Sequence, residues 1–257
     1  MTWKTINLAH IHTLAVEEMS LGWVIPPPLS GVTKTDEEFE EERMEMVKRL
    51  IRQGLLESQN IAEAMMRVPR ERFVPLEYRD YAYLEIPLPL PGDGRNQTIS
   101  CPHSYPLFYE ALGLRRGDRF LEVGAGSGYG AALAREIVGG EGRVVTIEIN
   151  EETRDFARNN LEGLGYRDVV VVLGDGSEGY PPKAPYDKIC VTATCPRIPP
   201  PLIDQLNPQG KLVAPVGPSY TAQSLMLLKK EEDLGVKTRV IEEVLYVPLL
   251  GKHGWKT

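Results

Sequence analysis

From Tyr105 onward, short segments rich in Val and Ile alternate with helical patterns, and this alternation restricts the fold more than any other feature of the chain. Near-continuous apolar strands separated by helices are typical of a parallel sheet buried on both faces. We predict strands at Arg119–Val123, Val144–Ile149, Val169–Leu173, Lys188–Thr192, Lys211–Pro215, Ser224–Lys229 and Val240–Val247. Helices are predicted between the early strands, at Tyr129–Val138 and Glu151–Leu161. The fold class is therefore α/β, with a doubly wound, mostly parallel sheet.

Length and composition agree with one globular domain. A chain of 257 residues supports one sizeable core with at most a small appendage. Hydrophobic residues make up 42% and charged residues 25%, which excludes a disordered or fibrous chain. The net charge of −7 makes nucleic acid and anionic membranes unfavourable partners. No apolar run approaches the roughly 18–20 residues of a membrane span. We expect a cytoplasmic protein, either a monomer or a small homo-oligomer.

The chain divides into an N-terminal extension, residues 1–43, and a single domain, residues 44–257. The extension contains a proline run, Pro26–Pro28, which is stiff and extended. Within the domain, residues 44–104 are expected to carry helices and a substrate loop. Residues 105–257 are expected to form the α/β core.

Two helices are predicted ahead of that core. The acidic stretch Asp36–Glu42 continues into a helical pattern. Apolar residues three and four apart mark this helix: Met44, Val47, Leu50, Ile51 and Leu55. A second helix should begin at Ser58 or Asn60, either of which can cap it, and end at Pro69.

Cysteine and histidine spacing gives no metal site in the sequence. Cys101, Cys190 and Cys195 fit neither a disulfide framework nor a zinc motif. His10 and His12 could bind a metal weakly, but a solvated tail is the simpler interpretation. We therefore expect no metal cofactor.

The predicted strand ending at Val123 runs directly into Gly124, Gly126 and Gly128, and a helix follows at once. Glycine at alternate positions allows a sharp turn and a close approach of a ligand to the backbone. The helix N-terminus then offers free N–H groups to an anionic group. The spacing is G-x-G-x-G, whereas the dinucleotide fingerprint is G-x-G-x-x-G. No Gly-Lys-Ser/Thr is present, which excludes a phosphate-binding P-loop.

Acidic residues end the next two predicted strands. Glu148 lies about 20 residues beyond the glycines, where it can accept hydrogen bonds from a ribose diol. Asp175 follows the third strand and could accept from an adenine amino group. A glycine turn can also be a plain connector, and a strand-end acid is often a helix cap. Together and in this order, however, the three elements favour S-adenosylmethionine, which has ribose and adenine but no pyrophosphate.

The remaining motifs resemble those of one family. They are Arg72–Pro75, Ala82–Glu85, Gln97–Ser100 with Pro102 and His103, Gly124–Gly128, Gly174–Gly176, Ala184–Asp187, Val191–Ala193, Leu206–Gly217 and Tyr246–Leu249. From about Met44 to the C-terminus, the chain resembles protein-L-isoaspartate O-methyltransferases. The glycine turn is common to many methyltransferases, whereas the Thr-Ile-Ser segment with the Val-Pro-Leu ending is specific. The resemblance implies a Rossmann-like methyltransferase fold with a seven-stranded sheet.

The resemblance also implies an activity. A methyl group would pass from S-adenosylmethionine to the α-carboxylate of an L-isoaspartyl residue in a damaged protein, and the ester would collapse to a succinimide whose hydrolysis returns some normal aspartate. Ser100 occupies the catalytic position by this resemblance. The expected substrate contacts are Ala82, Tyr83, Glu85, Val191, Ala193 and Thr194. The expected cofactor contacts are Thr98, Ile99, Ser100, His103, Glu122, Gly124, Gly126, Ser127, Gly128, Glu148, Ile149, Asp175, Gly176 and Gln223.

Purely structural roles are alternatives for some of these residues. Ser100 could instead cap a helix at Tyr105–Leu112. His103 fits a structural role as well as a catalytic one, and Cys101 is interpreted as packing. The chemistry needs few groups, because a carboxyl group with a pKa of about 4 is already ionised at pH 7.

The chain departs from the family pattern mainly in its substrate half. About 43 N-terminal residues have no counterpart, and Glu85 stands where Asp is usual. The link Pro91–Asn96 is longer by a few residues, which changes the rim of the expected cleft. Pro208–Gly210 replaces a Pro-Gly-Gly turn, and Thr194–Cys195 replaces two small residues.

These departures leave rival functions open. A relative could methylate an Asp side chain in a dedicated peptide, which would install isoaspartate where repair removes it. A non-catalytic module could retain the cofactor pocket for regulation. A dinucleotide-dependent oxidoreductase conflicts with the glycine spacing.

Overall fold

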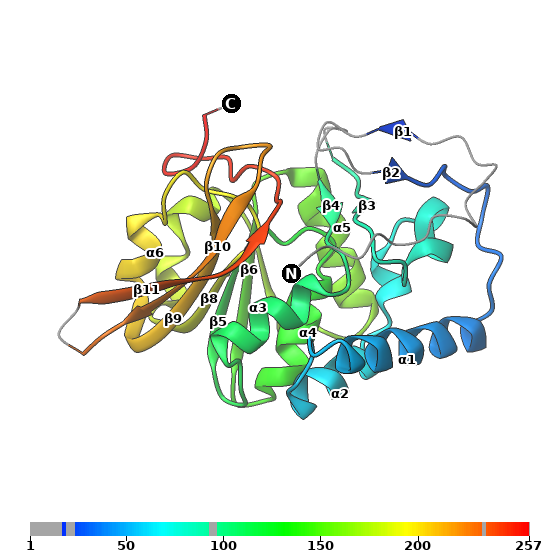
Figure 1. Ribbon diagram of the computed structural model, residues 1–257, viewed down its shortest axis with the longest axis horizontal. Helices are drawn as coiled ribbons and strands as arrows, with labels where there is room; N and C mark the ends of the chain where they lie inside the picture. The colour runs from blue at the N-terminus through cyan, green and yellow to red at the C-terminus, as the bar shows by residue number, and fades with distance from the viewer. Residues whose placement is uncertain (1–16, 19–23, 93–96, 233–234, 257) are drawn as a thin grey trace.

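The computed structural model describes residues 17–18, 24–92, 97–232 and 235–256 of the chain. A seven-stranded sheet with the order β11-β10-β9-β8-β5-β6-β7 forms its centre (Figure 1). Its strands are β5 (Arg119–Val123), β6 (Arg143–Glu148), β7 (Val170–Leu173), β8 (Tyr186–Val191), β9 (Leu206–Val216), β10 (Gln223–Lys230) and β11 (Val236–Val244). The strands from β9 to β7 pair in parallel, and β10 is antiparallel to both of its neighbours.

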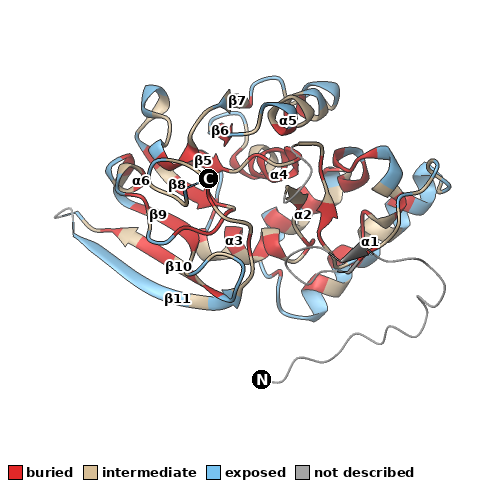
Figure 2. Cartoon of the chain, turned by 90° about the horizontal axis from the view of Figure 1, so that it is seen from above, coloured by how far each residue is buried: buried red, intermediate tan, exposed pale blue. Residues whose placement is uncertain are grey.

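Helices cover both faces of this sheet. Those on the sheet are α3 (Ser104–Leu112), α4 (Tyr129–Val138), α5 (Glu151–Gly163) and α6 (Pro200–Asp204). The helix α2 (Gln59–Arg67) packs on α4, and α1 (Asp36–Arg52) packs on α2. Neighbouring residues of a strand point to opposite faces, so Phe120 joins the core beneath α3, α4 and α5, and Leu121 joins the core beside α6. Seen from above, buried residues fill the central strands and α4, whereas β11 is largely exposed (Figure 2). The α/β, doubly wound prediction is confirmed.

The sequence located most elements, with shifts at their ends. β5 and α4 have the predicted bounds. β9 begins at Leu206, five residues before the prediction, and β11 begins at Val236, four residues before it. The short helix α6 was not predicted, because its sequence begins with two prolines.

The helix α1 crosses the boundary that we placed after residue 43. Thr35 caps it by accepting from the Glu38 backbone N–H, while the Glu38 carboxylate accepts from the Thr35 backbone N–H. Its buried residues are Phe39, Met46, Val47 and Leu50. Ile51 and Leu55, which we expected on the apolar face, are exposed at 50% and 37%. The core-facing stripe therefore starts earlier in the chain than predicted, within the acidic stretch.

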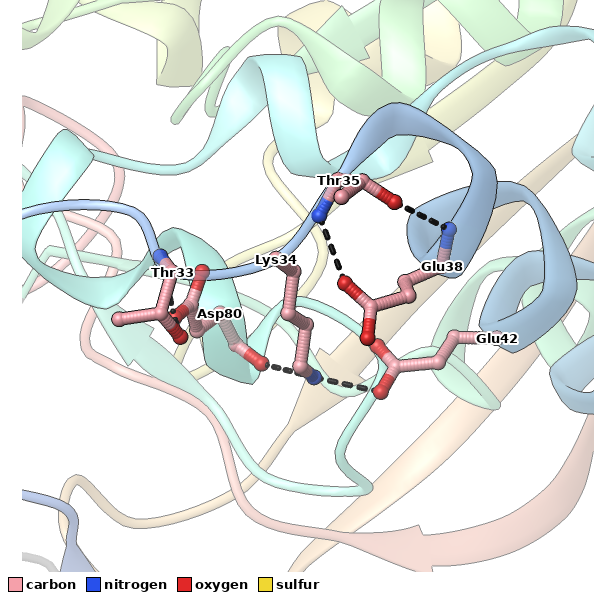
Figure 3. Close-up of polar contacts among 6 residues, drawn as sticks. All are labelled: Thr33, Lys34, Thr35, Glu38, Glu42 and Asp80. Carbon is pink, nitrogen blue, oxygen red and sulfur yellow. Dashed lines mark hydrogen bonds and ion pairs between the residues drawn. The ribbon is translucent and has the colours of Figure 1, made fainter.

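The segment before α1 is anchored to the short helix η2 (Leu76–Tyr81). The Thr33 backbone N–H and hydroxyl both donate to Asp80 Oδ2, over 2.9 and 2.5 Å (Figure 3). Lys34 Nζ donates to the Asp80 carbonyl over 2.6 Å and pairs with Glu42. Part of the predicted extension is thus built into the domain, and residues 1–16, with His10 and His12, lie outside the described ranges.

Irregular structure connects α2 to α3. It consists of η1 (Arg70–Phe73), η2 and a two-stranded ribbon of β3 (Leu88–Pro89) and β4 (Thr98–Ile99). The link between β3 and β4, which we expected to alter the cleft rim, includes residues 93–96 outside the described ranges. A second small ribbon pairs β1 (Glu17–Glu18) with β2 (Val24–Ile25). Within the described residues, no helix is both long and apolar enough to cross a membrane.

Candidate active site

The glycine turn lies where the winding of the sheet reverses. The chain places β6 and β7 on one side of β5 and then returns to place β8 on the other. In open α/β sheets, ligands bind at the carboxyl ends of the strands at such a reversal. Gly124 follows β5 with φ of +98°, and the Thr192 hydroxyl at the end of β8 donates to the carbonyls of Val123 and Gly124. An added Cβ at Gly124 would lie 2.3 Å from Thr192 Oγ1, so this turn requires glycine.

The other two glycines serve two different contacts. Gly126 has φ of +52°, and a Cβ on it would lie 3.5 Å from Leu90 and 3.7 Å from the Thr98 carbonyl oxygen. The β3–β4 ribbon therefore packs directly over the turn. Gly128, with φ of +85°, is the N-cap of α4 and packs against Leu161 of α5. These contacts bring the predicted cofactor residues Thr98 and Gly126 together.

Glu148 ends β6 beside the turn, as its position in the sequence predicts. Its Oε2 accepts from the Gly126 N–H over 3.1 Å, and its Oε1 accepts from the backbone N–H groups of Ile149 and Asn150. Burial raises the pKa of Glu148, although these backbone hydrogen bonds oppose the shift. The Ile149 side chain is 44% exposed next to it. An acceptor and an apolar surface thus stand side by side at this strand end.

Asp175 follows β7, but its carboxylate is already used within the fold. It accepts from the backbone N–H and hydroxyl of Ser177 and from the backbone N–H of Lys252. Gly176 is buried, and a Cβ on it would meet Val123 at 2.5 Å. These contacts tie the C-terminal segment to the strand end, and the predicted contact with adenine remains a prediction.

Glu122 is the most strongly perturbed acid of the site. It is 2% exposed on β5 and accepts a 2.7 Å hydrogen bond from the Thr146 hydroxyl. Burial, and secondarily the charge of Glu148, raises the pKa of Glu122 to about 8, so the carboxyl is largely protonated at pH 7. A cavity of about 20 Å³, enough for one water molecule, adjoins it. Its lining residues are Ser100, Ser104, Tyr105, Phe108, Tyr109, Glu122, Cys190, Thr192 and Tyr246.

Ser100 is held in place by a buried arginine that sequence reasoning missed. Arg70 is fully buried and donates from Nη2 to the Ser100 carbonyl over 2.6 Å and from Nε to the Ala82 carbonyl over 2.7 Å. Its guanidinium also lies over the rings of Tyr105 and Tyr129, 5.7 and 5.2 Å from their centroids. The alternative that Ser100 caps α3 is wrong, because α3 begins at Ser104 with His103 at the N-cap position.

Glu85 and His103 form a pair beside Ser100. The His103 backbone N–H donates to Glu85 Oε1 over 2.9 Å, and Nδ1 lies 2.7 Å from the same oxygen. Arg49 of α1 pairs with Glu85 Oε2 at 2.9 Å. Burial alone would raise the pKa of Glu85, but the contacts with His103 outweigh it and lower the pKa to about 2. His103 therefore has a defined partner, in line with the structural role considered above.

Several predicted substrate residues have buried side chains. Ala82, Val191 and Thr194 are fully buried and Ala193 is 7% exposed. Tyr83 is 5% exposed, and its hydroxyl donates to Glu71. Thr192, which lies within the strand end from Val191 to Thr194 that is expected to line the substrate pocket, is its partly exposed member. The alternation of a strand end is the signal that could have identified it.

Three predicted cofactor residues have roles inside the fold. The Gln223 amide is buried, accepts from the Tyr246 N–H and donates to the carbonyls of Pro218 and Tyr246. The Ser127 hydroxyl accepts from the Tyr129 N–H. Ile99 is 1% exposed in the main core. Cofactor contacts for these three remain predictions.

The strand ends fit S-adenosylmethionine by their own chemistry. The turn is lined by glycines with positive φ angles, so no side chain covers its backbone, and Glu148 lies beside an exposed apolar residue. A carboxylate has about four acceptor positions. Three of those on Glu148 take backbone N–H groups, which leaves about one for a ribose hydroxyl. Gly124–Gly128, Glu148 and Ile149 would hold the cofactor.

Comparisons with known proteins agree with this geometry. The family model described as protein-L-isoaspartate(D-aspartate) O-methyltransferase (PCMT) matches residues 41–254. A protein-L-isoaspartate O-methyltransferase of Hyperthermus butylicus is 48% identical over 232 residues, covering 87% of this chain and 95% of that protein. One of Methanopyrus kandleri is 47% identical over 226 residues, covering 88% and 98%.

Solved structures add the fold. The structure of a protein-L-isoaspartate O-methyltransferase superposes on this chain with a TM-score of 0.75 at 33% sequence identity. The match covers 82% of this chain and 66% of the other chain, which is just under two thirds of its length. A Plasmodium falciparum structure, described as a putative protein-L-isoaspartate O-methyltransferase in complex with S-adenosyl-L-homocysteine, gives 0.70 at 22% identity, over 80% of this chain and 97% of that one. This protein therefore belongs to the protein-L-isoaspartate O-methyltransferase family.

Proposed function

We propose that the protein transfers a methyl group from S-adenosylmethionine to the α-carboxylate of L-isoaspartyl residues in damaged proteins, as the first step of their repair. One observation carries the proposal. The segment with Ser100 is packed over the glycine turn through Leu90 and Thr98, and Arg70 holds its backbone. A cofactor site and a small hydroxyl donor thus meet at the reversal point of the sheet.

The chemistry requires positioning more than acid–base catalysis. When bound, S-adenosylmethionine supplies an electrophilic methyl group on a sulfonium sulfur. The substrate carboxylate is ionised at neutral pH, so no side chain has to remove a proton. The Ser100 hydroxyl would donate a hydrogen bond to one carboxylate oxygen and leave the other free to attack. Alignment of this kind supplies several kcal/mol of rate enhancement.

The hydroxyl is a better donor here than a cation would be. A lysine or arginine on the attacking carboxylate would stabilise its charge and weaken it as a nucleophile. In this structure the nearby guanidinium of Arg70 donates instead to the Ser100 carbonyl. The positive charge is thereby used to position the segment, and the hydroxyl stays neutral.

The expected substrates are proteins or peptides that contain isoaspartate, and we place the reaction in the cytoplasm. The acidic charge of the chain argues against a nucleic-acid substrate. The test is incubation with S-adenosylmethionine labelled in its methyl group and one of two peptides, identical except for L-isoaspartate or L-aspartate at one position. We expect base-labile methyl ester on the isoaspartyl peptide alone.

Other outcomes would overturn this proposal. Ester on the aspartyl peptide alone would identify an enzyme that modifies normal Asp side chains. Cofactor binding by calorimetry without ester on either peptide would favour a non-catalytic cofactor-binding module. Preferential binding of NAD over S-adenosylhomocysteine would reject the cofactor itself.

A further inference from the structure

Three side chains with metal-binding atoms lie together beside Ser100, although the first of them is well separated from the other two in the sequence. Glu85, Cys101 and His103 each offer one ligand atom, and these atoms all lie within 4.8 Å of one another. Glu85 comes from the segment after η2, and the other two follow β4. Among the described residues, no other group of three His, Cys, Asp or Glu side chains meets this criterion.

The donor set suits zinc. A thiolate, an imidazole and a carboxylate are its usual protein ligands, at about 2.3, 2.0–2.1 and 2.0–2.2 Å. Tetrahedral geometry at these lengths separates the ligand atoms by about 3.3–3.8 Å. His103 Nδ1 and Glu85 Oε1 are 2.7 Å apart, so they would have to separate by less than about 1 Å to admit the ion.

We propose that Glu85, Cys101 and His103 bind one Zn²⁺ ion, with water as the fourth ligand, and that this ion inhibits the enzyme. The metal would replace the hydrogen bond between Nδ1 and Oε1. The imidazole would then carry its proton on Nε2 in place of Nδ1, and the Cys101 thiol would release its proton to solvent. The inhibitory part rests on the proposed function, whereas the binding part does not.

The other contacts of the cluster can persist beside a bound ion, including the His103 backbone N–H, which donates to Glu85 Oε1. Arg49 pairs with Glu85 Oε2, on the oxygen that the metal does not need, and both members of this pair are partly exposed. The His103 side chain is 38% exposed, which provides a path from solvent and a position for the water ligand. Cys101 is 5% exposed, so its sulfur would form the inner side of the site. Cys101 follows Ser100 directly, and a metal there would restrain the segment that must admit the substrate.

Binding is tested on the full chain, freed of metals with a chelator, by titration with Co²⁺. Cobalt takes zinc sites, and a Co²⁺–thiolate bond produces a charge-transfer absorption band in the near ultraviolet. His10, His12 and other exposed histidines cannot produce that band, because they carry no sulfur. We expect a band that saturates at one Co²⁺ per chain and is lost when Zn²⁺ is added.

Matched variants show which side chains produce the absorption band. Cys101→Ala should abolish it, and Glu85→Gln should weaken Co²⁺ binding by more than about tenfold. Cys195→Ala is the control, because Cys195 is buried against the Pro215 carbonyl and lies outside the cluster. A thermal unfolding curve confirms that each variant is folded. No band in the parent protein, or a band that persists in Cys101→Ala, would overturn the proposed site.

Inhibition is measured separately with the isoaspartyl peptide. Zn²⁺ should suppress methyl transfer by the parent protein and by Cys195→Ala, and a chelator should restore it. Methyl transfer by Cys101→Ala should resist the same Zn²⁺ concentration. Equal suppression of Cys101→Ala would refute inhibition through this site. If no ester forms even without zinc, the proposed function fails, while the Co²⁺ band still decides the site.

Discussion

The two halves of the site are built in different ways. The cofactor half consists of the carboxyl ends of β5, β6 and β7 and their turns, and it is held by regular strand pairing and by glycine conformation. The substrate half, residues 70–103, contains short 3₁₀ helices and two-residue strands. Single buried polar side chains, above all Arg70, hold its parts together. Regular pairing spreads the stabilisation over many groups, so the substrate half should be the more sensitive to one substitution.

Replacing Arg70 by Met is the sharpest test of that difference. The change preserves length and apolar contact but leaves the carbonyls of Ser100 and Ala82 without their donor. A buried carbonyl that is left without its donor costs about 1–3 kcal/mol. We expect the free energy of unfolding to fall by an amount of that size. The rate of methyl transfer should fall by a larger factor than the affinity for S-adenosylhomocysteine.

Two variants control this prediction. Arg67→Met removes a 51%-exposed arginine that makes surface ion pairs, and it should cost under about 1 kcal/mol. Arg70→Lys keeps the charge and one donor, so it should recover part of the methyl transfer. Equal losses for Arg67→Met and Arg70→Met would contradict the special role of the buried arginine.

The cofactor half contains a buried acid, Glu122, whose contribution to stability should depend on pH. Burial raises the pKa of Glu122 from its usual range to about 8, so the native state binds a proton that the unfolded state releases. Its contribution is complete below about pH 4.3 and is lost as pH rises toward 8. Each unit of the shift corresponds to about 1.4 kcal/mol.

The measurement compares the parent with Glu122→Gln by urea unfolding between pH 5 and pH 9, without cofactor. The parent should lose a few kcal/mol relative to the variant across this range. Parallel pH profiles would show that Glu122 does not take up this proton. Glu136→Gln, which removes a partly exposed acid that pairs with Arg67, is the control for loss of a carboxylate elsewhere in the fold.

Ser100→Ala tests the chemistry of the substrate half. Misplacement of a reacting group by about 1 Å can cost about 100-fold in rate, and we expect a loss of that order in kcat. S-adenosylhomocysteine affinity by calorimetry should change little. Equal losses in turnover and cofactor affinity would assign Ser100 to cofactor binding instead. Ser224→Ala, on β10, should alter neither quantity.

The same division explains what the sequence could predict. β5 and α4 were located with their bounds because an apolar run that ends in glycines is a local signal. Glu148 was placed correctly because parallel strands bring their carboxyl ends to one edge. β9 was predicted too short because Pro208 and Gly210 indicate a turn, whereas the strand continues through them with Gln209 at φ of +65°.

The substrate half was predictable only through family resemblance. Arg70 contacts residues 12 and 30 positions away, and no periodicity marks it. Glu85 and His103 are 18 positions apart, so no spacing rule for metal ligands includes them together. Thr192 was not distinguished from the rest of the strand end from Val191 to Thr194, although the pleat of the strand turns Thr192, not its buried neighbours, toward the turn.

Gly124→Ala probes the glycine turn of the cofactor half. The new Cβ would lie 2.3 Å from Thr192 Oγ1 and would force a non-glycine residue into φ of +98°. We expect S-adenosylhomocysteine affinity to fall by about tenfold, which is about 1.4 kcal/mol. Gly165→Ala is the matched control, because Gly165 has φ of +89° but nothing within 4 Å of its Cβ. It should lower stability through backbone strain alone and leave affinity unchanged.

The smallest effect should come from the segment that precedes α1. Thr33→Ala removes one of the two hydrogen bonds to Asp80 Oδ2, and the backbone N–H keeps the other (Figure 3). Burial alone would raise the pKa of Asp80, yet the contacts with Thr33 outweigh it and leave the pKa lowered. Such a hydrogen bond contributes about 1 kcal/mol, so the free energy of unfolding of Thr33→Ala should fall by that amount. Thr238 is exposed, and Thr238→Ala is the control that should show no loss.

The functional readout of Thr33→Ala decides to which half this segment belongs. Asp80 lies in the last turn of η2, shortly ahead of Ala82 and Glu85. A looser anchor should therefore raise KM for the isoaspartyl peptide slightly and leave S-adenosylhomocysteine affinity intact. A change in cofactor affinity without a change in KM would attach the segment to the cofactor half. If Thr33→Ala lowers stability but changes neither KM nor the cofactor affinity, the segment before α1 only stabilises α1. The substrate half would then begin at Arg70.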